Sequence, residues 1–134
     1  MGLDANPDMI NMARVAAEQE RLTIEWYTSP AEQLPFPDEH FDLVLCQFGL
    51  MFFADRHAAL NEMHRVLRKG GTLIIAHALS SEEIKAHHKG ASPVSRDFLP
   101  EEKEMRELMA NVGFRVARLI DRPKCYLCEG NKGF

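Results

Sequence analysis

The sequence predicts an α/β fold with a largely parallel sheet, and three observations support this prediction. Strand-like and helix-like patterns alternate along most of the chain. Residues 41–48 form a near-continuous apolar run, as is typical of a strand buried on both faces of a parallel sheet. The last two strand-like segments are separated only by the short turn 121–123, which predicts an antiparallel hairpin at one edge.

Length and composition limit what the chain can be. Its 134 residues predict a single domain spanning residues 1–134, and 46% hydrophobic with 27% charged residues is ordinary for a globular protein. A net charge of −4 argues against a nucleic-acid partner, and no apolar stretch approaches the length of a membrane span. Three cysteines and the absence of a secretory leader pattern favour a reducing, cytoplasmic location.

The first half of the chain predicts three strands and one helix. The helix can be capped by Asn6 or Asp8, has Pro7 at its first position and carries one apolar face. Proline and aspartate interrupt the long loop before the apolar run. The predicted elements are a strand end at 2–5, a helix from 7 to about 19, a strand at 22–27, a loop at 28–40 and a strand at 41–48.

The second half predicts three helices and three strands. The first helix is amphipathic, and we expect the pair Gly70-Gly71 to end it, as Gly113 ends the last helix. The acidic pair Glu101-Glu102 suits the start of that last helix. The predicted elements are helices at 56–67, 80–88 and 100–112 and strands at 72–78, 114–120 and 125–128.

Three segments in this order resemble the class I S-adenosylmethionine (SAM)-dependent methyltransferases, and most closely the ubiquinone/menaquinone-biosynthesis C-methyltransferases. They are GLDANPDMI at 2–10, AEQLPFPDEHFD at 31–42, and VLCQFGL at 44–50 followed by RVLRKGG at 65–71. The resemblance covers essentially the whole chain. It implies a Rossmann-like, three-layer α/β/α sandwich, SAM as cofactor and a small molecule as methyl acceptor.

The resemblance assigns cofactor contacts to the strand that ends at Asp4 and to the loop at Ala31. Asp4 would accept the ribose hydroxyls of SAM; alternatively, it only caps the following helix. Met9 would pack near the adenine, and a role in the core alone is an equal alternative. The backbone N–H of Ala31 would bond an adenine nitrogen. Pro30 stands where the family has an acidic acceptor for the adenine amino group, which departs from the family pattern.

The resemblance also places Gln47 and Phe48 beneath the methionine part and the methyl group of SAM. Gln47 would orient substrate or cofactor; alternatively, it is a polar residue at a strand end that bonds nearby backbone.

One part of the family pattern is absent from this sequence. The family's first strand ends in a G-x-G-x-G turn that approaches the cofactor, and no such segment occurs here. In the family this strand lies mid-sheet, between the strands that end at Asp4 and begin at Phe41, so its loss would expose backbone edges and apolar faces. The chain is therefore expected to be either a fragment of a longer reading frame or a short protein that closes the gap by dimerisation or strand exchange. In either case we expect weak SAM binding or none.

The remaining candidates are histidines and cysteines. His88 is the candidate general base for a substrate, with His77 and His87 as weaker candidates; alternatively, these histidines are solvated surface residues. Cys125 and Cys128 have C-x-x-C spacing, but in a predicted strand residues three apart face opposite sides, so we expect no metal or redox site.

Overall fold

The computed structural model describes residues 1–88 and 98–133. The helices and strands alternate in the predicted order. In chain order they are β1 (Gly2–Asp4), α1 (Pro7–Gln19), β2 (Trp26–Thr28), β3 (Phe41–Gln47), the short 3-10 helix η1 (Leu50–Phe52), α2 (Arg56–Val66), β4 (Leu67–His77), α3 (Ser81–His88), α4 (Glu102–Val112), β5 (Phe114–Arg122) and β6 (Cys125–Lys132).

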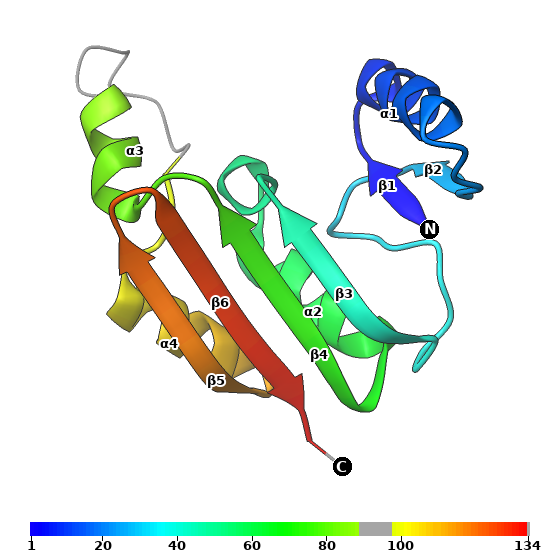
Figure 1. Cartoon of the computed structure of the whole chain (residues 1–134). Helices are drawn as coiled ribbons and strands as arrows, with labels where there is room; N and C mark the ends of the chain where they lie inside the picture. Colours follow the sequence, from blue (N-terminus) through cyan, green and yellow to red (C-terminus); the bar gives the residue numbers. More distant parts are fainter. Residues whose placement is uncertain (89–97, 134) are drawn as a thin grey trace.

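The described strands form two separate sheets. β1 and β2 pair in parallel, while the larger sheet has the order β3-β4-β6-β5 (Figure 1). Within the larger sheet β3 and β4 are parallel, and β6 is antiparallel to both β4 and β5, which confirms the predicted C-terminal hairpin. No ladder joins β1 to β3, so each of these strands has an edge that is not paired within the described residues.

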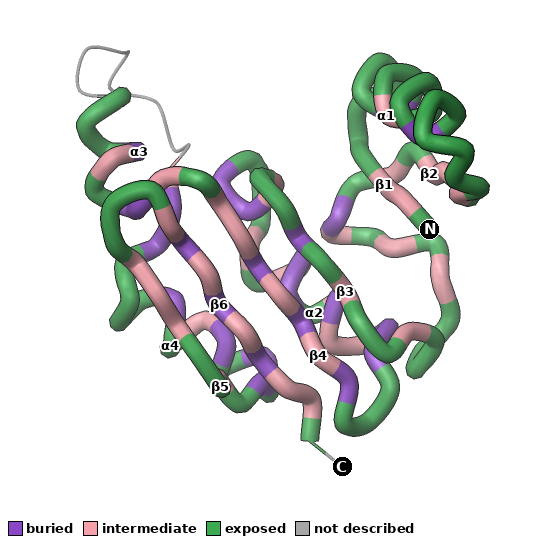
Figure 2. The backbone as a smooth tube through the Cα atoms, viewed as in Figure 1, coloured by how far each residue is buried: buried purple, intermediate pink, exposed green. Residues whose placement is uncertain are grey.

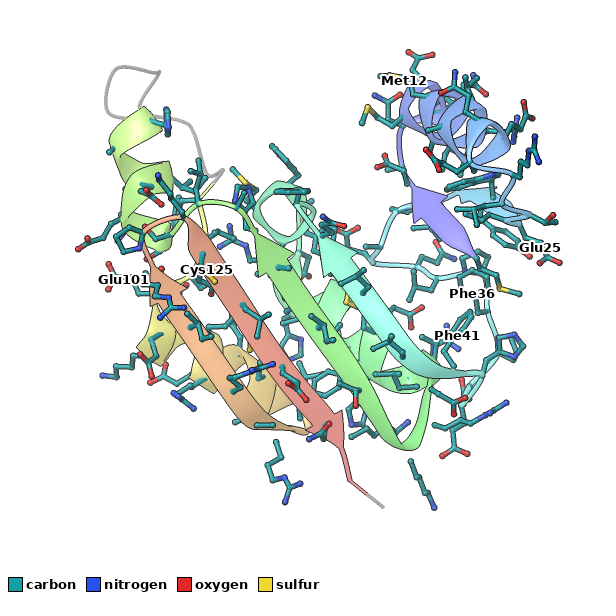
Figure 3. All side chains as sticks on the ribbon, in the orientation of Figure 1. Met12, Glu25, Phe36, Phe41, Glu101 and Cys125 are labelled. Carbon is teal, nitrogen blue, oxygen red and sulfur yellow. The ribbon has the colours of Figure 1, made fainter. Side chains whose placement is uncertain are left out.

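Aromatic rings connect the small sheet to the large one. Tyr27 of β2 contacts Phe36 edge to face, and Phe36 contacts Phe41 at the start of β3 in the same way, with centroid separations of 4.9 and 5.0 Å. Figure 3 shows Phe36 and Phe41 between the small sheet and the large sheet. The loop 29–40 is therefore held by packing of its own side chains as well as by its two ends.

The hydrophobic core lies on one face of the larger sheet. α2 and α4 both cover that face, and their apolar stripes meet every second residue of the strands (Figures 1 and 2). The sheet residues in this core include Cys46, Leu73, Ile75, Tyr126 and Cys128. The Rossmann-like α/β fold is thus built here with one helical layer on the larger sheet, while α1 packs on β1 and β2.

The other face of the larger sheet carries apolar side chains with no helix over them in the described residues. Leu43 and Leu45 of β3 are 55% and 58% exposed, and Ile74 and Ala76 beside them on β4 are half-buried. The prediction that residues 41–48 are buried on both faces was therefore wrong. The apolar run is present, but only the side toward α2 and α4 meets a helical layer.

The glycine pair at 70–71 does not end a helix, contrary to the prediction. α2 ends at Val66 and the chain continues directly as β4, whose pairing with β3 is interrupted by a bulge between Leu67 and Thr72. Gly70 adopts φ 78°, and an added Cβ at Gly71 would lie 3.1 Å from the Asp42 carbonyl oxygen. The glycines therefore let the strand bulge beside β3.

A lysine from the opposite end of the chain completes the C-terminus of α2. Lys132 Nζ donates to the carbonyl oxygens of His64 and Leu67 at 2.9 and 2.8 Å. The bonds from Lys132 tie β6 to the helix–strand junction.

Candidate functional site

The candidate site lies at the carboxyl ends of β1, β3 and β4, where α/β folds bind ligands. Asp4 is the last residue of β1, Gln47 the last of β3 and His77 the last of β4. Because β3 and β4 are hydrogen-bonded neighbours, the structure brings Gln47, Phe48 and His77 together. Asp4 stands on the other sheet.

Asp4 lies in the loop that starts α1. Its Oδ1 accepts the backbone N–H of Asn6 at 2.8 Å, and the Asn6 side chain in turn accepts the N–H of Asp8 at 2.9 Å. Asn6 is thus the N-cap of α1, with Pro7 at the first helical position. The Asp4 carboxylate is exposed, so its role as a ribose ligand stays a prediction, alongside the bond it makes to the turn.

Met9 and Ala31 occupy different environments. Met9, in the first turn of α1, is 49% exposed, so it is not a core residue among the described residues. Ala31 is buried in the main core, and the carbonyl of Pro30 before it accepts the N–H of Gln33 at 3.2 Å. The backbone at Ala31 is therefore fixed by core packing, whereas Met9 is held only by its place on α1.

Phe48 has an unusual backbone conformation at the end of β3. Its φ is 60°, in the left-handed region that non-glycine residues rarely adopt, at a cost of about 1 kcal/mol. Its N–H still donates to the carbonyl of Ala76 at 3.1 Å, which prolongs the ladder by one bond. Phe48 is 45% exposed, and its ring contacts the His77 ring edge to face with centroids 4.9 Å apart.

His77 is held in one orientation by the backbone. Its Nδ1 accepts the N–H of Leu79 at 3.0 Å, and partial burial lowers the pKa of the imidazole below its ordinary value. An imidazole whose Nδ1 is an acceptor carries its proton on Nε2 when neutral. His87 is exposed on α3. His88 ends α3, and its side chain lies outside the described residues, so its predicted role as a base stays a prediction.

The three cysteines lie in strands of the large sheet. All three are free thiols, and burial raises the pKa of both Cys46 and Cys128 to about 11. Cys125 and Cys128 lie in β6, with Cys128 on the buried face and Cys125 on the other. Thiols with such a raised pKa are protonated near neutral pH and therefore poor nucleophiles. Within residues 1–88 and 98–133, no three of the His, Cys, Asp and Glu side chains gather as metal ligands would.

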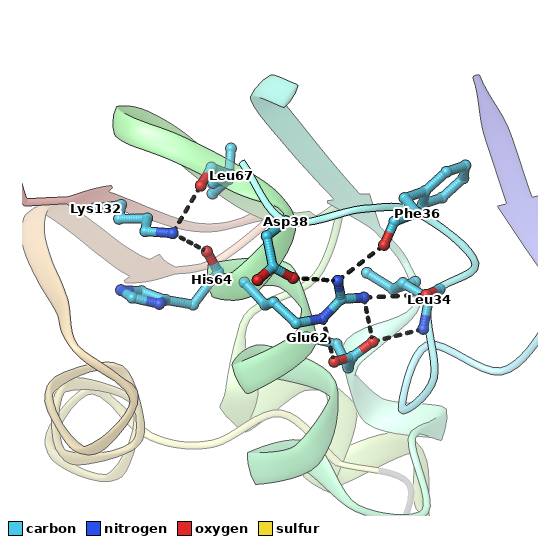
Figure 4. A network of polar contacts seen from close by, with 8 residues as sticks. Leu34, Phe36, Asp38, Glu62, His64, Leu67 and Lys132 are labelled. Carbon is cyan, nitrogen blue, oxygen red and sulfur yellow. Dashed lines mark hydrogen bonds and ion pairs between the residues drawn. The ribbon is translucent and has the colours of Figure 1, made fainter. Parts of the chain in front are cut away.

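Sequence reasoning missed an arginine network that joins two of the segments carrying the resemblance. Arg65 on α2 donates to the carbonyls of Leu34 and Phe36 at 3.1 and 2.8 Å, and to the carboxylate of Asp38 at 2.8 Å (Figure 4). It also forms a two-point contact with Glu62 at 2.7 and 2.9 Å, and Glu62 accepts the N–H of Leu34 at 2.8 Å. These bonds raise the pKa of Arg65 and lower that of Glu62.

This network gives a physical reason for the spacing of the two segments. Arg65 of the RVLRKGG segment donates hydrogen bonds to the LPFPD stretch of the AEQLPFPDEHFD segment. These bonds hold the loop that carries Ala31. The sequence signal was present as an Arg and a Glu three residues apart on a helix. Their partners lie 27 to 31 residues away in the chain, which no local pattern reveals.

The residues present match SAM only in part. Asp4 offers a carboxylate and Met9 an exposed apolar side chain near the start of α1, as the adenosine half requires. For the methionine half, Gln47 and Phe48 are available, but the sequence has no G-x-G-x-G turn and the two groups of residues stand on separate sheets. Within the part of the chain that the structure describes, the residues predicted to contact SAM therefore stand on two sheets that no ladder joins.

No helix within the described residues has the length and apolar character needed to cross a membrane.

Comparison with known proteins identifies relatives for the first half of the chain. Residues 1–75 match the family model described as a methyltransferase domain. A demethylmenaquinone methyltransferase of Deinococcus radiodurans is 43% identical over 75 residues, which are 56% of this chain and 31% of that protein. A ubiquinone/menaquinone biosynthesis C-methyltransferase of a Geobacter species is 39% identical over 79 residues, 56% of this chain and 33% of that protein. The matches thus span about a third of these relatives' length.

Solved structures match nearly the whole chain in fold. A SAM-dependent methyltransferase of Methanosarcina mazei superposes with a TM-score of 0.77 at 22% identity, covering 99% of this chain and 81% of that one. The [4+2]-cyclase SpnF superposes with a TM-score of 0.79 at 16% identity, covering 98% and 65%. The fold is therefore shared with a protein named as a cyclase, and fold alone does not determine the reaction. The match over residues 1–75 shows that the chain belongs to the methyltransferase domain family, with the Rossmann-like fold of the class I SAM-dependent methyltransferases.

Proposed function

We propose that this chain is a single, partial domain of a SAM-dependent methyltransferase that acts on a small molecule, and that it binds SAM weakly or not at all when alone. Asp4, Met9 and Ala31 are the proposed adenosine contacts, and Gln47 and Phe48 the contacts to the methionine part. The observation that carries the weak-binding proposal is the division into two sheets. Contacts on two sheets that no described ladder joins are less firmly held relative to each other, and fixing them around one ligand costs binding free energy.

Calorimetry tests this proposal in two steps. For the chain alone we expect no measurable SAM binding, or a dissociation constant in the millimolar range. A micromolar constant for the chain alone would refute the weak-binding proposal. In a chimaera that adds a strand, G-x-G-x-G turn and helix from a matched methyltransferase before Met1, we expect affinity to rise into the micromolar range.

The same chimaera tests the residue assignments. Replacement of Asp4 by Ala should weaken SAM binding about tenfold or more, because two hydroxyl hydrogen bonds to a charged acceptor are lost. Replacement of exposed Glu20 by Ala, past the C-terminal end of α1, is the control and should leave affinity unchanged. If the Asp4→Ala variant and its parent bound SAM with equal affinity, the assignment of Asp4 to the ribose would be wrong. Asp4 would then serve only to form the turn before α1.

We propose a second candidate function, a non-catalytic methyltransferase-like subunit that completes its sheet with a second copy or with a partner chain. The favouring observation is the contrast between the two outer strands of the large sheet. β5 carries Arg115, Arg118 and Arg122. Charged side chains of this kind discourage an edge strand from pairing with a further strand. β3 has Asp42 as its single charge and presents Leu43 and Leu45 with more than half their surface exposed.

Light scattering coupled to size-exclusion chromatography tests the second candidate. We expect the purified chain to elute as a dimer or larger, and Leu45→Lys on β3 to shift it toward monomer. Ala117→Lys adds the same charge to the other edge strand and should leave the mass unchanged. A stable monomer at high concentration would count against self-association.

The cysteines bear on the cellular compartment of the protein, and its net charge bears on the class of ligand. Three free cysteines, two of them buried, fit a reducing compartment, and we propose the cytoplasm. A net charge of −4 favours small-molecule ligands over nucleic acid.

A further inference from the structure

A cavity of about 430 Å³ opens at the end of the large sheet opposite to the carboxyl ends of β3 and β4. Its lining residues come from the start of β4, the start of β5 and the end of β6, and are Gly70, Arg115, Asn131, Lys132 and Gly133. Figure 1 shows these strand ends far from the site predicted for SAM. The cavity is within the size range of small-molecule sites and is separate from the proposed cofactor contacts.

Two of the lining side chains stand next to each other on one face of the sheet. Asn131 is the register partner of Thr72 on one side and of Arg115 on the other. Directly opposed residues in a sheet share a face, with their Cβ atoms about 5 Å apart. Because Leu73, next to Thr72, points into the core, this is the face that no described helix covers.

Both of these side chains offer hydrogen-bond donors that have no acceptor. Asn131 Oδ1 accepts the hydroxyl proton of Thr72 at 3.0 Å, which leaves the Asn131 Nδ2–H groups for another partner. Neither these groups nor the Arg115 guanidinium forms a hydrogen bond within residues 1–88 and 98–133. Two donor groups from neighbouring strands therefore line the cavity without an acceptor to share.

The charges around the cavity are positive. None of its lining residues is acidic. Glu129, one pair further along the same face, is already paired with Arg118 at 3.4 Å. The ammonium of Lys132 is taken by two carbonyl oxygens, but Lys69, next in the chain to a lining glycine, has no ion pair in the described part of the chain. Arg115 and Lys69 thus leave positive charge at this end of the sheet that no described carboxylate offsets.

From this geometry we propose that the cavity binds the phosphate group of a small molecule, with Arg115 and Asn131 as its ligands. A guanidinium donates two parallel N–H bonds to two phosphate oxygens, and the Asn131 amide donates to the third. The double negative charge of the phosphate suits Arg115 and Lys69. Gly70 and Gly133 contribute no side chain, which leaves room for the rest of the ligand. This site goes beyond the proposed methyltransferase function and does not depend on it.

An NMR titration of the ¹⁵N-labelled chain tests the proposal, at pH 7.5 and at an ionic strength held constant with chloride. Inorganic phosphate and glycerol 3-phosphate are the probes, and acetate is the carboxylate for comparison. We expect either phosphate probe to shift the Arg115 Nε–H and Asn131 Nδ2–H resonances with a dissociation constant in the millimolar range, and acetate to bind about tenfold more weakly. The relative affinity of the two phosphate probes then shows whether the site takes the free ion or an ester. The Arg118 Nε–H resonance should not move.

Variants on the surface of the sheet assign the donors. Arg115→Gln should weaken phosphate binding about tenfold or more, because a charged two-point contact is lost. Asn131→Asp should weaken it as strongly, because a carboxylate repels the phosphate. Arg118→Gln, on the same strand, is the matched control and should leave the affinity unchanged.

Three results would overturn the proposal. They are equal affinity for acetate and phosphate, no shift at Arg115 in the unmodified chain, and equal losses in Arg115→Gln and Arg118→Gln. The first two do not depend on a variant folding. Because SAM is absent throughout, each of these results leaves the proposed methyltransferase function as it stands.

Discussion

At the scale of single residues, Arg65 links a helix to a loop that is distant in the sequence. It joins α2 to the loop 34–38 through three hydrogen bonds, to the carbonyls of Leu34 and Phe36 and to the Asp38 carboxylate. Two more hydrogen bonds go to the carboxylate of Glu62 on the same helix. We expect Arg65→Lys to lower the free energy of unfolding by about 1–3 kcal/mol, because an ammonium cannot reproduce the planar, two-point contacts and leaves Glu62 poorly paired. Urea unfolding measures this loss.

Arg68 provides the matched control for that prediction. It pairs with Asp42 at 3.2 Å, and both side chains are more than half exposed. Arg68→Lys should change the free energy of unfolding by less than about 0.5 kcal/mol, since exposed ion pairs contribute little. Equal effects at Arg65 and Arg68 would mean that the network of Figure 4 does not hold the loop.

His64 predicts how stability depends on pH. Burial, and then the nearby charge of Lys132, lower the pKa of His64 in the folded state, so the unfolded chain binds the proton more readily. Its contribution to stability is therefore complete above the unfolded value of about 6.5 and is lost as the pH falls through that value toward the folded pKa.

Urea unfolding between pH 7.5 and 5.5 measures the effect. The unmodified chain should lose stability steadily across this window, and His64→Gln should make the loss smaller. His57→Gln, at an exposed position of α2, is expected to keep the original slope. An unchanged slope in His64→Gln would assign the dependence to other groups, of which His77, with its lowered pKa, is the first to examine.

At the scale of elements, the sequence predicted the types and the order of the helices and strands well, and their boundaries less well. Helices with explicit end signals were placed within two residues, because Asn6 and Gly113 act locally as caps. The end of α2 was placed within one residue but was assigned to the wrong signal, because its last carbonyls are completed by Lys132 from β6 and not by the adjacent glycines. The exposure of β3 was misjudged for a similar reason, since burial depends on which layers are present and not on the strand's own composition.

Gly113 allows a sharp test at this scale. It ends α4 with φ 104°, and a Cβ there would also lie 3.2 Å from His64 Nε2. Gly113→Ala should destabilise the fold by about 1–2 kcal/mol, and Gly113→Asn by less, because asparagine tolerates the left-handed region better. Gly133→Ala, where an added Cβ meets no atom within 4 Å, is the control for the thermal or urea unfolding measurement. A neutral Gly113→Ala variant would show that α4 can end in another conformation.

At the scale of the whole molecule, the two sheets differ in how much core supports them. The large sheet packs against α2 and α4 through a continuous cluster of buried side chains, whereas α1 buries only Ile10 and Ala17 over the small sheet. An isolated two-stranded sheet is marginally stable in water, so the unit formed by β1, α1 and β2 depends on its connection through Phe36. We therefore expect this unit to open without unfolding of the large sheet.

Amide hydrogen exchange read residue by residue by NMR tests this division. The hydrogen-bonded amides of β1 and β2 should exchange at least about 100-fold faster than those at the centre of β4 and β6, where Leu73 and Cys128 are fully buried. Phe36→Ala removes the ring that contacts both Tyr27 and Phe41, and should speed exchange in β1 and β2 while leaving β4 and β6 unchanged. Phe52→Ala, a ring that is mostly exposed, is the control. Equal protection of both sheets would show that they unfold as one unit, and would remove the argument that SAM contacts on separate sheets must be brought together at a cost in binding.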